Sequence, residues 1–282
     1  MNKQIETEIS AEEVPAQLAY PSIKQGWGML GYFILITLLY SIPLGVIQLS
    51  GIDIQHGFYL LMNYSIPMIL LIWLLRFFWK KNPENGRFLS LKPFPLIILP
   101  MVVLMTLSFI WINSEITSWV PMPSFLENLF KEMMEPNIWG FLTVAVAAPI
   151  LEETLLRGIV LEGLLKNYNP KKAIIWSALF FGILHLNPWQ FVAAFIVALG
   201  IGYLYWRTRS LWLCIFIHFL NNATAFLIYF LYPDTTDTAD LFEIGTINRV
   251  LIFGLAIFIL WLVYRYFENY FKSSTAESAS KI

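Results

Sequence analysis

The sequence predicts an all-α polytopic membrane protein, folded as a bundle of about eight transmembrane helices. Two properties of its composition support this prediction: 58% of the 282 residues are hydrophobic and only 13% are charged, and the mean hydropathy is +0.65. An average soluble protein carries about 25% charged residues. The third observation is that apolar runs long enough to cross a bilayer recur along the chain, which favours one membrane domain over two soluble ones.

A transmembrane helix needs about 20 mainly apolar residues. On this criterion we expect helices near residues 27–49, 57–79, 94–113, 138–165, 172–186, 188–206, 211–232 and 247–267. The fifth run is short and only Asn187 and Pro188 separate it from the sixth, so these two segments could instead form a re-entrant pair. Four prolines inside spans are expected to mark kinks, which neighbouring helices accommodate in a membrane bundle: Pro43, Pro67, Pro100 and Pro149.

The basic residues give an independent test of this count, because cytoplasmic loops are enriched in Lys and Arg. In the eight-span prediction, 15 of the 18 Lys and Arg residues lie on one side of the membrane. The opposite side holds Lys131 and Arg249, and Arg157 lies inside a span. We therefore expect both termini in the cytoplasm, with the protein in the plasma membrane.

We expect a single transmembrane domain, residues 26–272, with the candidate functional residues between 138 and 224. It lies between a polar N-terminal tail (1–25) and a polar C-terminal tail (273–282), both expected to be poorly ordered. Residues 114–136 combine apolar and charged side chains. This combination is typical of an amphipathic helix at the membrane surface or, equally, of an amphipathic loop.

Two carboxylates and a guanidinium interrupt the apolar run 138–165: Glu152, Glu153 and Arg157. Ionisable side chains at bilayer depth are rare, face the protein interior and mark functional sites. At about 100° per residue, Arg157 lies roughly 40° around the helix from Glu153 and about 140° from Glu152. Glu153 and Arg157 are therefore predicted to form an ion pair, which leaves Glu152 to find partners on other helices. Alternatively, all three residues only hold helices together.

Two histidines lie in later spans, His185 and His218, and Asn222 follows His218 by one helical turn. A carboxylate and an imidazole can deprotonate water, and a second imidazole with an amide can stabilise an oxyanion. Glu152, His185 and His218 also match the ligand types of a catalytic zinc site, so the cofactor is either Zn²⁺ or none. Counted from the cytoplasmic ends of their spans, His218 lies only about 10 Å deep, against roughly 20 Å for Glu152 and His185. A tilted helix, or one that extends beyond the bilayer, is therefore needed to bring the three together.

Several other sites are excluded. The sequence has no His-Glu-x-x-His and no Gly-x-Ser-x-Gly, and its four aspartates all fall in predicted loops. The single Cys214 cannot form an internal disulfide. A net charge of -1 gives no indication of a nucleic-acid partner.

Three short motifs on separate predicted spans follow one another in the chain. Glu152-Glu153-x-x-x-Arg157, Phe181-x-x-x-His185 and His218-x-x-x-Asn222 resemble the three motifs of the CAAX protease and bacteriocin-processing family, also called the Abi family. This family includes the Ras-converting prenyl endopeptidase. The resemblance covers about residues 138–224.

The resemblance implies an intramembrane endopeptidase in which Glu152 and His185 activate water, Glu153 and Arg157 form a structural pair, and His218 and Asn222 bind the oxyanion. The family has been described both as metalloproteases and as metal-free glutamate proteases, so it leaves zinc open. We expect the substrate to be a membrane-associated or lipid-modified peptide or protein. The alternatives are a non-catalytic bacteriocin-immunity or envelope partner and a proton-coupled transporter, although no internal repeat typical of transporters is visible.

Overall fold

The structure is a computed structural model and describes residues 18–280 except 53, 55, 135 and 233–243. These residues form helices joined by short loops, without a β-sheet in the described part of the chain. The elements are α1 (Ile23–Leu49), α2 (Phe58–Lys81), η1 (Leu96–Ile98), α3 (Leu99–Ser118), α4 (Ser124–Met133), α5 (Ile138–Phe141), η2 (Leu142–Ala147), α6 (Ala148–Glu153), η3 (Thr154–Leu161), α7 (Glu162–Asn167), α8 (Pro170–Leu184), α9 (Pro188–Thr208), α10 (Leu211–Leu231) and α11 (Thr246–Ser280).

The predicted fold class is confirmed: the chain is an all-α, multi-pass integral membrane protein. Helical stretches occupy all eight predicted positions, but only six helices in the described residues are long and apolar enough to cross a membrane. The stretch 138–167 is interrupted by π-helical turns, and the 15 residues of α8 span only about 22 Å at 1.5 Å per residue. The number eight is therefore approximate.

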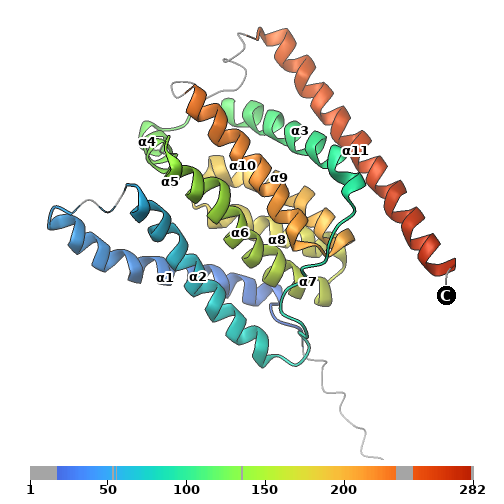
Figure 1. The fold of residues 1–282 in the computed structure, drawn as a ribbon, viewed down its shortest axis with the longest axis horizontal. Coiled ribbons are helices and arrows are strands. Elements are labelled where there is room, and N and C mark those ends of the chain that lie inside the picture. The colour runs from blue at the N-terminus through green and yellow to red at the C-terminus, as the bar shows by residue number, and fades with distance from the viewer. Residues whose placement is uncertain (1–17, 53, 55, 135, 233–243, 281–282) are drawn as a thin grey trace, which may run out of the picture.

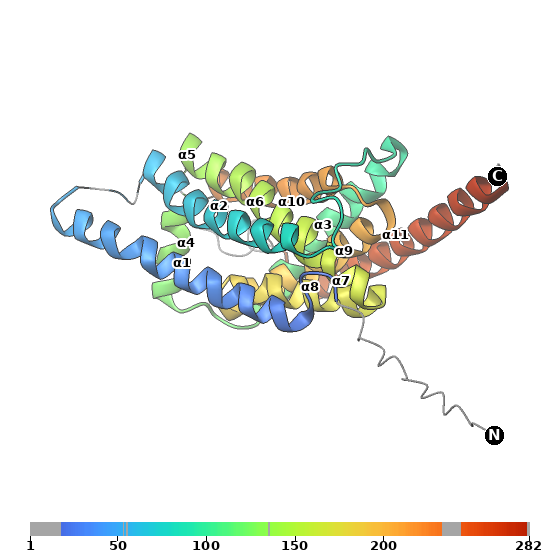
Figure 2. The ribbon, with the colours of Figure 1, turned by 90° about the horizontal axis from the view of Figure 1, so that it is seen from below.

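The stretch 138–167 forms the centre of the bundle. It packs against α2, α8, α9 and α10, and Leu155, Leu156, Ile159, Val160 and Leu161 are completely buried. In contrast, α1 and α11 lie at opposite edges of the bundle in both views (Figure 1 and Figure 2). Most of their apolar side chains are exposed, as expected for helices that face lipid.

Two π-helical segments, η2 and η3, enclose the six residues of α6. Such wide turns in helices occur frequently at functional sites, and α6 ends with Glu152 and Glu153.

Pro149 is in the first turn of α6. Pro100 was predicted to lie mid-span but is in the first turn of α3, where a proline breaks no helical hydrogen bond.

The basic end of the bundle, where α2 and α7 end and α8 begins, is closed by residues 18–22 and by the loop 82–95. Asn85 is 1% exposed; its side chain accepts a hydrogen bond from the Tyr20 amide (2.7 Å) and donates one to the Trp79 carbonyl (3.2 Å). The Asn167 side chain bonds both backbone groups of Ala19. Burial raises the pKa of the Tyr20 hydroxyl above its usual range.

Three predicted boundaries need comment. The N-terminal tail does not extend to residue 25, because residues 19, 20 and 22 are buried and α1 begins at Ile23; residues 1–17 lie outside the described part. Residues 273–280 of the C-terminal tail continue helix α11. Within 114–136, residues 124–133 form the amphipathic helix α4, whereas the first five residues complete α3.

Candidate active site

Glu152 is in α6 with its side chain 13% exposed. Its Oε1 accepts a hydrogen bond from the Tyr64 hydroxyl of α2 at 2.5 Å. Its Oε2 is buried and accepts no hydrogen bond from the described residues, but lies 3.8 Å from Nε2 of His218 on α10. The two oxygens of this carboxylate therefore differ, because one is held by a hydrogen bond and the other is buried without one.

Glu153 is fully buried and accepts two charge-assisted hydrogen bonds at a single oxygen. Its Oε1 lies 2.8 Å from Arg157 NH1 and 2.8 Å from His218 Nδ1. Arg157, 1% exposed, also donates to the Ala198 carbonyl at 3.3 Å and stacks on Phe181 at 5.0 Å. The predicted contact between Glu153 and Arg157 is therefore present. Glu153 also holds the His218 ring in place.

The Glu153 contact also determines how His218 faces Glu152. An ionised carboxylate can only accept hydrogen bonds, so Nδ1 of His218 carries a hydrogen and donates it to Glu153. In the neutral imidazole the lone pair is then on Nε2, the atom nearest to Glu152 Oε2. This arrangement resembles the way in which a carboxylate orients the histidine of a catalytic triad.

The depth of His218 differs from the expectation because α10 begins inside the bundle. The Leu211 side chain, in the first turn of α10, lies 3.7 Å from the position of a Cβ on Gly158. Gly158 precedes the end of the stretch 138–167 by nine residues, or about 13 Å. The loop 82–95 contacts this end of α10, where the Ser90 carbonyl accepts a hydrogen bond from the Leu211 amide at 3.1 Å.

His185 directly follows the last residue of α8. Its ring centroid lies 5.0 Å from that of Phe181, and the His218 ring centroid lies 5.7 Å from that of the same Phe181. His185 Nδ1 donates to the Phe181 carbonyl at 2.9 Å, which leaves Nε2 with a lone pair. Leu186, the next residue, has φ +56°, a strained value for leucine. In the described residues His185 makes no hydrogen bond or ion pair with either glutamate, so its role in water activation stays a prediction.

Asn222 projects from α10 toward η2. Its amide Nδ2 donates to the Val144 carbonyl at 2.9 Å, and its Oδ1 accepts from Asn221 at 3.1 Å. One amide hydrogen is thus engaged with the backbone, and the second is available. The oxyanion role of Asn222 stays a prediction.

The predicted zinc ligands do not fit a metal site as they stand. Glu152 and His218 are close enough to share a ligand, but the described residues contain no group of three or more His, Cys, Asp or Glu arranged to hold a metal ion. His185, the third candidate, is turned to the Phe181 carbonyl. Zinc binding stays a prediction, and no step below depends on it.

Tyr64 is the residue that sequence reasoning missed. It lies in the predicted span 57–79, outside the three motifs, and tyrosine is too common in membrane helices to attract attention by itself. A search for every hydroxyl within the spans would have included it among many others. Only the packing of α2 against α6 distinguishes it.

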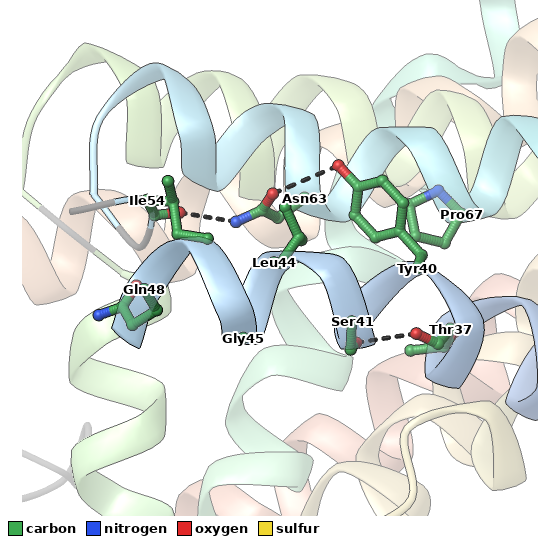
Figure 3. A pocket seen from close by; sticks show the side chains of 9 residues that line it. All are labelled: Thr37, Tyr40, Ser41, Leu44, Gly45, Gln48, Ile54, Asn63 and Pro67. Carbon is green, nitrogen blue, oxygen red and sulfur yellow. Dashed lines mark hydrogen bonds between the residues drawn. The ribbon is translucent and has the colours of Figure 1, made fainter. Parts of the chain in front are cut away.

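A pocket among the described residues lies elsewhere, between α1 and α2 near their connecting loop (Figure 3). It measures about 260 Å³ and is lined by neutral side chains of both helices, among them Tyr40 and Asn63, which share a hydrogen bond of 3.4 Å. A second cavity, of about 230 Å³, lies between α3, α9 and α11. No predicted site residue lines either of them.

Known proteins are similar to the segment of this chain that carries the three motifs. A family model described as type II CAAX prenyl endopeptidase Rce1-like matches residues 134–224. The Bacillus subtilis (strain 168) protein "Putative membrane peptidase YdiL" is 31% identical over 79 residues, which are 28% of this chain and 32% of that protein. The chain therefore matches about a third of the length of this relative. No solved structure matches the chain significantly. The matched segment carries all three motifs in order, so residues 134–224 are similar to the Rce1-like type II CAAX prenyl endopeptidases, in agreement with the resemblance to the CAAX protease and bacteriocin-processing family.

Proposed function

We propose that this protein is an intramembrane endopeptidase in which Glu152 activates water to hydrolyse a peptide bond. The observation that carries the proposal is the free Glu152 Oε2, buried and 3.8 Å from His218 Nε2, in the segment that matches the family model. A buried carboxylate oxygen without a partner is costly. This cost is offset if water or substrate donates a hydrogen bond to the oxygen.

In the proposed reaction, Glu152 accepts a proton from a water molecule as its oxygen attacks the carbonyl carbon of the peptide. The tetrahedral intermediate then collapses with cleavage of the C–N bond, and the proton passes to the leaving amine. A positioned general base of this kind contributes about 10²- to 10⁴-fold to the rate. Glu153 holds His218 with Nε2 toward Glu152, and donation from this atom to the developing oxyanion requires the protonated form of the ring, in which Nε2 carries a hydrogen.

The proposed substrate is a peptide segment of a membrane-associated or lipid-modified protein. Glu152 lies within the helical bundle, so a scissile bond has to enter between helices to reach it. A site inside the bundle also excludes bulk water. Hydrogen bonds to the oxyanion are stronger in such a medium of low dielectric constant. His185 and Asn222 are proposed to complete the site in the roles that the family motifs suggest.

The test is a comparison of membrane proteomes from cells that express the wild type, Glu152→Gln or Glu162→Gln. Glu162 is a matched control, because it lies in the same helical stretch but is paired with Arg209 at 2.7 Å. We expect peptide termini that appear with the wild type and with Glu162→Gln and disappear with Glu152→Gln. Identical sets of termini for all three proteins would contradict the proposal.

A further inference from the structure

We propose that Tyr64 is a positioning residue that selects which oxygen of Glu152 reacts. The inference rests on the proposed function and extends it to a residue of α2, which lies outside the segment 134–224 that matches the family model. The Tyr64 hydroxyl donates to Glu152 Oε1 at 2.5 Å. Oε2 is thereby left as the reactive oxygen, facing His218.

The length of the contact indicates a strong hydrogen bond. Hydroxyl groups that donate to carboxylates at about 2.5–2.7 Å form bonds roughly twice as strong as those between neutral groups. The surroundings reinforce it, because a hydrogen bond is stronger in a medium of low dielectric constant. Tyr64 therefore restrains the rotation of the Glu152 carboxylate about its last bond.

The packing of α2 keeps this donor in place. α2 contacts α5, η2, α6 and η3, and so follows the central stretch over most of its length. Met68 and Leu71, on the turns that follow Tyr64, are 5% and 0% exposed. A tyrosine on a helix anchored in this way is a rigid donor, which is what a positioned carboxylate requires.

Tyr64 could also merely connect α2 to α6, and enzyme kinetics separate the two roles. The variant Tyr64→Phe keeps the ring and removes the donor. If Tyr64 positions Glu152, this variant lowers kcat by up to about 10²-fold, the effect of a misplaced catalytic group, with KM little changed. If Tyr64 only connects two helices, thermal stability falls and kcat of the folded protein stays the same.

Tyr205→Phe is the matched control. Tyr205 donates to Glu162 at 2.9 Å, so this variant removes the same kind of bond at the basic end of the same helical stretch. We expect wild-type kcat and KM in this variant. Wild-type kcat in Tyr64→Phe, with Glu152→Gln inactive, would overturn the role of Tyr64 and leave the proposed function standing.

Infrared spectroscopy tests the contact without relying on activity. The antisymmetric carboxylate stretch of Glu152, identified as the band missing in Glu152→Gln, should shift in Tyr64→Phe and stay in place in Tyr205→Phe. An unshifted band in Tyr64→Phe would overturn the inference. Full activity of Glu152→Gln would instead remove the proposed function, whatever the spectrum shows.

Discussion

Two glutamates ten residues apart in the stretch 138–167 each accept a hydrogen bond from a tyrosine, yet their surroundings differ. At the basic end, Glu162 Oε2 receives both the Tyr205 hydroxyl, at 2.9 Å, and the Arg209 guanidinium, at 2.7 Å. In the centre, Glu152 receives the Tyr64 hydroxyl, and its nearest basic group is His218. An arginine turns the first glutamate into a structural connection between α7 and α9. Among the described residues no arginine forms an ion pair with the second glutamate, which is the one proposed to activate water.

Glu153 supports the same distinction. It is adjacent to Glu152 in the chain, but it is completely buried and paired with Arg157. Two of the three glutamates in this stretch are thus neutralised by an arginine. The position of the cation therefore separates the two paired carboxylates from the one proposed to react better than the depth of burial does.

The largest expected difference between the two regions is in turnover. Glu152→Gln should abolish cleavage by the purified protein, because an amide cannot accept the proton of water, while its unfolding temperature stays near that of the wild type. Glu162→Gln should keep wild-type turnover and lose about 1 kcal/mol of stability, the size expected for a partly exposed ion pair. Single-turnover assays and thermal unfolding in detergent measure both quantities. Loss of turnover in both variants would remove the distinction.

The second prediction compares the two arginines. Arg157→Ala leaves Glu153 charged and buried, which should cost about 3–5 kcal/mol of unfolding free energy, as for other broken buried ion pairs. Arg209 is 34% exposed, so water can solvate Glu162 in Arg209→Ala and the loss should be about 1 kcal/mol. Denaturant titrations in mixed micelles give both values. Equal losses would mean that burial does not determine the strength of these pairs.

Much of this fold follows directly from the sequence. Apolar runs locate the spans because the bilayer core has a fixed thickness, and the pairing of Glu153 with Arg157 follows from the geometry of a helical turn. Both features are local. They depend on residues close in the chain, and no knowledge of the packing between helices is needed.

The features that sequence reasoning missed depend on contacts between distant segments. The depth of His218 depends on the loop 82–95, which contacts residues more than 100 positions away, as in the hydrogen bond from Ser90 to the Arg209 carbonyl. The bond from Tyr64 to Glu152 spans 88 residues. The buried Asn85, which connects residues 18–22 to α2, reads in the sequence as an ordinary polar loop residue. A single sequence does not encode such pairings in any local pattern.

The smallest predicted effects concern two glycines of the same stretch, one in each region. A Cβ on Gly163, at the basic end, would lie 2.5 Å from the backbone nitrogen of Pro21 and from the Tyr20 carbonyl oxygen. Backbone atoms held by Asn85 and Asn167 cannot move aside, so Gly163→Ala should cost about 1–3 kcal/mol, as overpacking does. A Cβ on Gly158, nearer the centre, would meet the Leu89 Cδ2 at 2.5 Å, but this atom is the end of a flexible side chain and can rotate away. Gly158→Ala should therefore cost less than Gly163→Ala, and thermal unfolding of the two variants side by side decides the order. The reverse order would show that the loop 82–95 is held more rigidly under α10 than residues 18–22 are at the basic end.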